Sequence, residues 1–190
     1  MKKRIVIFAS GSGTNAENII KYFRRTQFAE VVRVLSNKKD AKVLERAEKL
    51  KVKADSFTKE ELFSKEGTLK VLKEIKPDII VLAGFLLKFP EIILNEFPNK
   101  VINIHPALLP KYGGKGMYGS FVHEAVVKNK EAETGITIHY VDENYDEGAI
   151  ISQKKVTLSE KETPETVAEK IHKLEHEWFP KIIEEVLRDG

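Results

Sequence analysis

The chain has 190 residues, a formal net charge of +3 and no cysteine. Its length fits one domain with a substantial core, and 42% hydrophobic with 32% charged residues is ordinary for a folded globular protein. The small charge, with no Lys/Arg cluster between aromatics, argues against a nucleic-acid partner, and the lack of cysteine excludes disulfides, thiolate metal sites and thiol nucleophiles.

The first element predicted along the chain is a strand over residues 4–9. Its continuous apolar run is typical of a strand buried on both faces. Basic residues precede it, as in a signal peptide, but the run is too short and passes straight into glycine-rich sequence, which favours a cytoplasmic protein. No apolar stretch approaches the roughly 20 residues of a membrane helix, so no membrane partner is expected.

Helices and strands are then predicted to alternate. The expected segments are a helix from the turn at 10–15 to about Phe23, a strand at 31–35, a helix at 41–50, a strand at 52–54, a helix at 59–75, and strands at 78–83 and 101–104. This alternation indicates a parallel, doubly wound α/β sheet of Rossmann-like type.

The pattern changes after Pro110. A glycine-dense loop over 111–119 leads to a short helix at 120–128, two strands at 134–141 and 149–158 that pair antiparallel, and a final helix from Pro164 to about Leu187. No repeat or linker interrupts the chain. The prediction is therefore one domain over residues 1–190, with a mostly parallel sheet and an antiparallel C-terminal portion.

The turn after the first strand is a candidate anion site. Gly11-x-Gly13-x-x-Ala16 satisfies a relaxed dinucleotide fingerprint, in which backbone amides and a helix N-terminus attract an anion. An NAD site also needs an acid after the second strand, where this chain has Ser36-Asn37. A compact monophosphate is therefore favoured over a dinucleotide or a merely tight turn.

The segment Val101–Pro110 places an amide and an imidazole side by side. Asn103 and His105 project from the same strand face, and Pro106 ends the strand. An amide donor beside a titratable base suits a reaction in which an oxyanion develops while a proton moves. The alternative is a pair of satisfied polar residues that close a strand.

An acidic loop follows at residues 142–148. It is interpreted either as a solvated hairpin loop or as the source of a carboxylate that folds back onto His105, fixes its tautomer and raises its pKa. Asp146, just before the turn glycine, is the best-placed candidate.

Two further patterns have ordinary alternatives. His172-x-x-Glu175-His176 matches an inverted zinc-protease motif, but a third ligand is lacking and an accidental match is favoured, so no metal is predicted. The apolar residues after the strand at 78–83 form either a wall for a flat heterocycle or plain core.

Taken together, these motifs resemble the glycinamide ribonucleotide formyltransferases, folate-dependent enzymes of purine biosynthesis. The resemblance spans essentially the whole chain and is carried by Ser10–Asn15, Pro77-Asp-x4-Ala-Gly84-Phe85, Asn103–Pro110, Thr134-Gly-x-Thr-x-His139-x-Val141 with Asp146-x-Gly148, and Glu175-His176. Related tRNA formyltransferases and formyltetrahydrofolate hydrolases carry a further domain, for which this chain has no room.

The resemblance implies roles for individual residues. Asn103, His105 and Asp146 are expected to be catalytic, with Asn103 as oxyanion donor and His105 as a protonated partner of Asp146. Expected to bind the substrate phosphate are Gly11, Ser12, Gly13, Thr14 and Asn15, and to contact the nucleotide, Pro106 and Glu175. Expected to bind folate are Phe85, Leu86, Leu87, Lys88, Phe89, Val141, Asp142 and Glu143. The loop 111–119 is longer than in common relatives and receives no role.

The implied reaction uses 10-formyltetrahydrofolate as co-substrate and glycinamide ribonucleotide as acceptor, without a metal, in a monomer or homodimer. Two alternatives stay open: another small-amine or sugar-nucleotide formyltransferase, and a nucleotide-binding regulatory module without catalysis.

Overall fold

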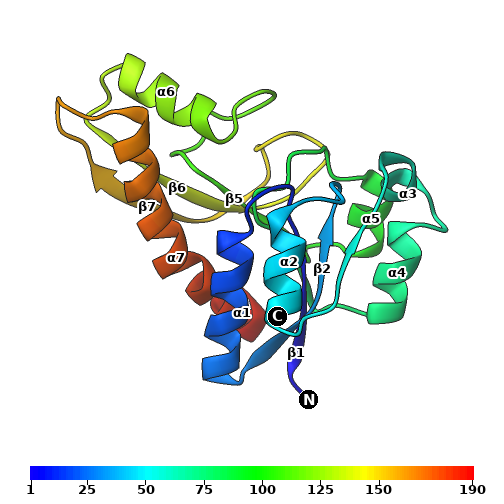
Figure 1. The fold of residues 1–190 in the computed structure, drawn as a ribbon. Helices are drawn as coiled ribbons and strands as arrows, with labels where there is room; N and C mark the ends of the chain where they lie inside the picture. Colours follow the sequence, from blue (N-terminus) through cyan, green and yellow to red (C-terminus); the bar gives the residue numbers. More distant parts are fainter.

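The computed structural model describes all 190 residues and contains one seven-stranded sheet. Its order is β3-β2-β1-β4-β5-β6-β7 (Figure 1). The strands are β1 (Lys3–Phe8), β2 (Ala29–Ser36), β3 (Ala54–Ser56), β4 (Ile79–Leu82), β5 (Val101–His105), β6 (Glu133–Tyr140) and β7 (Ile150–Thr157). All pairs from β3 to β5 are parallel, whereas β6 and β7 pair antiparallel. The predicted fold class is therefore confirmed.

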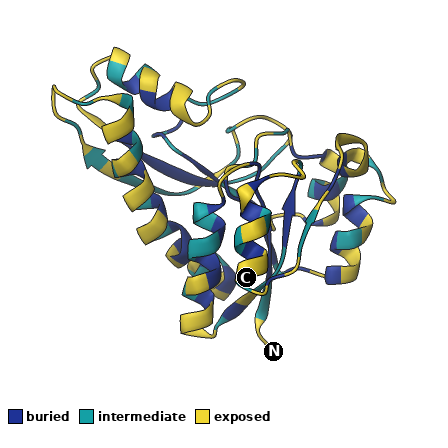
Figure 2. Ribbon diagram, viewed as in Figure 1, coloured by how far each residue is buried: buried dark blue, intermediate teal, exposed yellow.

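Helices cover both faces of this sheet, because its strands are apolar on both sides (Figure 2). Packed on one face are α1 (Thr14–Thr26), α2 (Lys42–Lys49), α6 (Ser120–Lys128) and α7 (Pro164–Asp189). Packed on the other are α3 (Lys59–Phe63), α4 (Thr68–Ile75) and α5 (Glu91–Glu96). Along β1, Ile5 and Ile7 join the first layer, and Val6 and Phe8 the second. None of these helices has the length and apolar character of a membrane span.

Two element predictions between residues 50 and 100 are wrong, and one helix there was not predicted. The helix expected over 59–75 is broken into α3 and α4, because the backbone is extended at Ser64 (ψ 142°) and non-helical at Gly67 (ψ −122°). A Cβ atom at position 67 would lie 2.1 Å from the carbonyl oxygen of Glu61, so the turn requires glycine. β3 begins at Ala54 because the N–H of Val52 still bonds to Ala47 at the end of α2 (2.9 Å). The six-residue α5 was not expected, since it is too short to show a helical period.

The strand order reverses between β1 and β4, which creates the crevice where ligands bind in doubly wound sheets. The loops that follow these two strands are joined at this point. The N–H of Ser10 donates to the carbonyl of Gly84 (3.0 Å), and the Ser10 hydroxyl accepts the N–H of Leu86 (3.0 Å).

Candidate functional site

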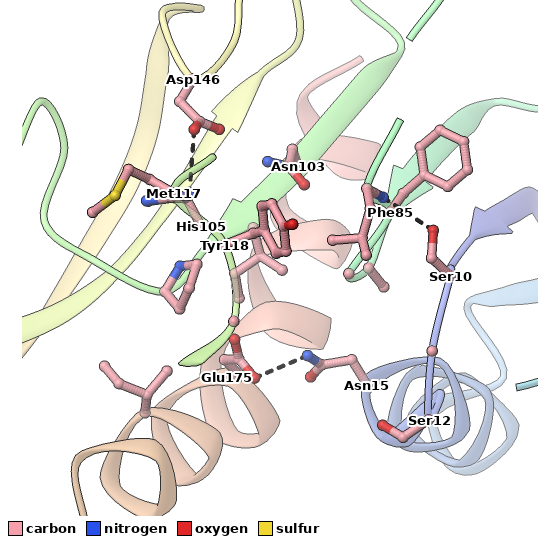
Figure 3. A pocket seen from close by; sticks show the side chains of 18 of the residues that line it. Ser10, Ser12, Asn15, Phe85, Asn103, His105, Met117, Tyr118, Asp146 and Glu175 are labelled. Carbon is pink, nitrogen blue, oxygen red and sulfur yellow. Dashed lines mark hydrogen bonds and ion pairs between the residues drawn. The ribbon is translucent and has the colours of Figure 1, made fainter. Parts of the chain in front are cut away.

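A cavity of about 650 Å³ opens at the carboxyl ends of β1, β4 and β5 (Figure 3). Its wall combines the loops after these strands with the loop 114–119, the Tyr145–Asp146 segment and one face of α7. The size is that of a small-molecule site. Most of the residues singled out from the sequence meet here, although they are up to 165 positions apart, from Ser10 to Glu175.

The N-terminus of α1 forms one end of the cavity, and the whole segment Gly11–Asn15 lines it. Gly13 caps the helix with a left-handed backbone (φ 76°) and no side-chain hydrogen bond, and a Cβ atom there would lie 2.5 Å from Val43. The first intrahelical bond is donated by Glu17, so the N–H groups of residues 14–16 have no backbone acceptor. Free amides and the helix dipole make this end suited to an anion.

The side chain of Asn15 is turned toward α7. Its Nδ2 donates to Oε2 of Glu175 (3.0 Å), and its Oδ1 is buried without a partner (Figure 3). Burial raises the pKa of the Glu175 carboxyl. Asn15 therefore offers a phosphate its backbone N–H, while its amide connects the anion end of the cavity to Glu175.

Asn103 and His105 lie at the end of β5 and share a face with residues of β6. Asn103 pairs with His139, and His105 with Thr137, and directly paired residues project to the same side. The amide Nδ2 of Asn103 lies 3.2 Å from Nε2 of His139, whose Nδ1 lies 2.8 Å from its neighbour's carbonyl, that of Tyr140. That carbonyl assigns the proton of His139 to Nδ1, so Nε2 accepts from Asn103.

His105 is 3% exposed and held from both ring nitrogens. Its Nε2 donates to the carbonyl of Tyr112 (2.7 Å), and its Nδ1 lies 3.5 Å from Oδ2 of Asp146. Burial lowers the pKa of His105, against the raising effects of Asp146 and the Tyr112 carbonyl. The predicted contact with Asp146 is present, and the carboxylate raises the His105 pKa as predicted. Desolvation outweighs this effect and favours the neutral ring, so the expectation of a protonated His105 is wrong.

Asp146 reaches the same cluster from the loop between β6 and β7. Oδ2 accepts the N–H of Gly114 (3.0 Å), and Oδ1 lies 3.6 Å from Nε2 of His139. Burial alone raises the Asp146 pKa, but its polar neighbours, which include His105 and the Gly114 amide, together bring it below its usual value. Asp146 is therefore ionised at neutral pH.

Most of the eight residues predicted to bind folate do not line the cavity. Only Phe85 and Leu86 of the eight line the cavity. Phe89 is 3% exposed and packs edge-on against Phe8, with 5.1 Å between ring centroids, so its ring belongs to the core. Lying outside the lining are Leu87, Lys88, Val141, Asp142 and Glu143.

Other cavity residues were not singled out from the sequence. Among them are Met117, Tyr118, His123 and Tyr145. His172, which also lines the cavity, and His139, in the cluster behind it, were named only as parts of motifs and received no role. The alternation of the strand at 134–141 puts His139 on the face of Thr137, a signal that was available. Only tertiary contacts could identify the loop residues. Pro106 and Glu175, predicted for the nucleotide, both line the cavity.

The histidines of the zinc-like motif lie on α7 without forming a metal cluster. His172 Nδ1 is 3.4 Å from Oε2 of Glu175, and its ring packs edge-on against that of His176 (5.9 Å). Nowhere in the chain do three or more His, Cys, Asp or Glu side chains form a group suited to a metal ion.

The protonation of His105 can be measured directly. We expect its ring to titrate below the usual histidine pKa of about 6.5. In Asp146→Asn the midpoint should fall further, because the carboxylate that favours the charged ring is gone. NMR of labelled imidazoles between pH 4 and 9 measures both midpoints, and His105→Gln identifies the resonance. A wild-type midpoint above the usual value would contradict the dominance of burial.

The chain matches a known protein family and several named relatives. The family model described as "Formyl transferase" matches residues 3–183. Phosphoribosylglycinamide formyltransferase of Bacillus subtilis is 35% identical over 97% of this chain and 95% of its own. The trifunctional purine biosynthetic protein adenosine-3 of Chironomus tentans is 37% identical over 96% of this chain, which covers 13% of that protein.

Solved structures agree with the sequence relatives. The phosphoribosylglycinamide formyltransferase of Bacillus halodurans superposes with a TM-score of 0.87 at 37% identity, covering 97% of this chain and 95% of its own. That of Anaplasma phagocytophilum gives 0.89 at 31% identity, covering 100% and 89%. With a family model over nearly its whole length and a full-length relative above 30% identity, the chain belongs to the formyl transferase family.

Proposed function

We propose that this protein transfers the formyl group of 10-formyltetrahydrofolate to the amine of glycinamide ribonucleotide, a step of purine biosynthesis. The observation that carries the proposal is the shared cavity: Asn103, His105 and ionised Asp146 lie within it or against it, and the free N-terminus of α1 forms its anion-binding end. Full-length relatives that bear the name of this activity support it.

The proposed substrates span the cavity from α1 to the Asn103 cluster. The phosphate occupies the amides of Gly11–Asn15, and the nucleotide extends past Pro106 and Glu175. Phe85 and Leu86 provide an apolar wall for the flat pterin. Phe89 supports this wall, since its ring lies 6.1 Å from that of Phe85.

In the reaction, the neutral amine attacks the formyl carbon to give a tetrahedral intermediate with an oxyanion, and the carbon–nitrogen bond to folate breaks when this intermediate collapses. The second hydrogen of the Asn103 amide, free of His139, donates to the oxyanion. Asp146 accepts the proton that the amine loses. His105, neutral at rest, shares that proton with Asp146 over 3.5 Å, and the pair returns it to the departing folate nitrogen. No covalent enzyme intermediate is needed.

We also propose that residues 1–190 act as one domain, as a monomer or homodimer in the cytoplasm, without a nucleic-acid or membrane partner or a metal. The first apolar run, which basic residues precede, forms central strand β1. An NAD-binding module is disfavoured because β2 ends at Ser36 and the next residue, Asn37, accepts the Ser10 hydroxyl (2.6 Å).

Initial rates with a 10-formyl folate analogue test the proposal, read by absorbance of the deformylated product. We expect product only when glycinamide ribonucleotide is present. Product without it would indicate a hydrolase, and product with other amines or amino-sugar nucleotides alone would indicate another formyltransferase. No product with any acceptor, together with a thermal shift by NAD, would favour the regulatory module.

A further inference from the structure

His123 on α6 is a buried side chain without a polar partner. It lines the cavity and is 8% exposed. Its Nδ1 is closed to solvent without a hydrogen bond, whereas its Nε2 is not closed to solvent and likewise has no protein partner, so Nε2 is the nitrogen that a ligand can reach. Only burial and the charge of His172 act on its pKa, and no hydrogen-bonding group does. Buried side-chain nitrogens are nearly always paired in folded proteins. An unpartnered ring at a cavity wall therefore indicates a partner that arrives with the ligand.

The neighbours of His123 place it beside the nucleotide. α6 packs against α7, where His172 is near enough for its charge to lower the His123 pKa. His172 contacts Glu175 (3.4 Å), and Glu175 contacts Asn15 in the anion-binding turn (3.0 Å). A polar row thus runs from the phosphate end of the cavity along α7 to α6, and it is separate from the cluster on β5.

The chemistry of the His123 ring indicates which group of the substrate it contacts. Burial lowers the pKa of His123 and favours the neutral ring, which has one N–H donor and one lone pair. An anion would favour a charged ring, whereas a hydroxyl both donates and accepts and matches a neutral imidazole. In the ribonucleotide, the uncharged group next to the phosphate is the sugar with its ring hydroxyls.

We propose that His123 binds a ring hydroxyl of the ribose and makes the enzyme selective for a hydroxylated sugar. This inference rests on the proposed function. It assigns to the α6 helix a specificity-determining residue that acts on substrate binding and takes no part in the proton transfer at Asn103, His105 and Asp146.

The test compares His123→Leu with wild type on two acceptors, at saturating formyl donor: glycinamide ribonucleotide and its analogue without the 2′ and 3′ hydroxyls. Loss of one neutral hydrogen bond should raise KM for the natural acceptor by roughly 3- to 12-fold. kcat and the KM for the formyl donor should stay unchanged. With the analogue, variant and wild type should have the same KM.

Three further measurements make the result specific. The melting temperature of His123→Leu should equal or exceed that of wild type, since a buried unpaired group is removed. His123→Gln keeps a hydrogen-bond donor and an acceptor and should recover part of the affinity for the natural acceptor. If the leucine variant does not fold, His123→Gln is compared with wild type on the same two acceptors. Glu124→Leu, at the next position and exposed outside the cavity, should behave as wild type.

An unchanged KM for the natural acceptor would overturn the inference and leave a water as the partner of His123. An equal rise with both acceptors would also overturn it, because the contact would then not be to a ring hydroxyl. If wild type formylates neither acceptor, the proposed function itself fails and this inference falls with it.

Discussion

Asp146→Asn is expected to lower kcat for formyl transfer by about 10²- to 10⁴-fold, the range of a lost general acid–base group. KM for both substrates should stay within a few-fold. The amide oxygen can still accept the N–H of Gly114, so the loop remains docked, while the charge 3.5 Å from His105 disappears. The uptake of the amine proton is then lost, but the shape of the cavity is not. Steady-state rates over both substrate concentrations measure the effect.

The neighbouring Glu147→Gln is the matched control. It removes one negative charge from the same loop at an exposed position outside the cavity, and it should keep wild-type kcat. Near-normal turnover of Asp146→Asn would contradict the role of this carboxylate. Equal losses in both variants would instead indicate an effect of the loop's overall charge.

Asn103→Ala is expected to lower kcat by about 10²- to 10³-fold, as for other single oxyanion donors. One hydrogen of its amide is directed to Nε2 of His139, which fixes the orientation of the group, and the other is free. Because the oxyanion exists only after attack, binding of the ground state should change little, and KM should be retained. Single-turnover rates separate this chemical step from product release.

Asn144→Ala controls for the loss of an amide outside the cavity, since Asn144 lies exposed in the loop between β6 and β7. Its kcat should match that of wild type. A rise in KM as large as the fall in kcat for Asn103→Ala would show that Asn103 binds the substrate itself and not the developing oxyanion.

Sequence patterns predicted the central sheet closely. The continuous apolar runs of β1, β4 and β5 belong to strands covered on both faces, and such runs end where the strand ends. The break between α3 and α4 depends on the non-helical backbone at Ser64 and Gly67, which hydrophobic periodicity does not reveal. Short elements such as α5 have the same limitation.

The candidate site, like the fold, was predictable from the sequence only in part. Asn103 and His105 are two residues apart on one strand, so their common face follows from the chain itself. Asp146 comes from a loop, and an acidic loop on a surface looks the same in sequence. The net pKa direction of His105 depends on how deeply the ring is buried, which only the packed structure gives. His123 was not predicted as a site residue, because its lack of a hydrogen-bond partner is apparent only in the packed structure.

The backbone beside His105 has a further consequence for protein engineering. Tyr112 and Asp146, which hold its two nitrogens, both have left-handed backbone (φ 56° and 58°), and a side chain there costs roughly 1 kcal/mol of folding stability relative to glycine. Glycine would relieve this strain at either position, although at position 112 it would also remove the hydroxyl that donates to Glu131 (2.7 Å) and accepts from Asn129 (2.8 Å). At position 112 the carbonyl that holds His105 would survive the exchange. At position 146, glycine would also relieve the strain, but it would remove the carboxylate. A screen of variant libraries for heat resistance therefore needs an additional test of enzyme activity for changes at that residue.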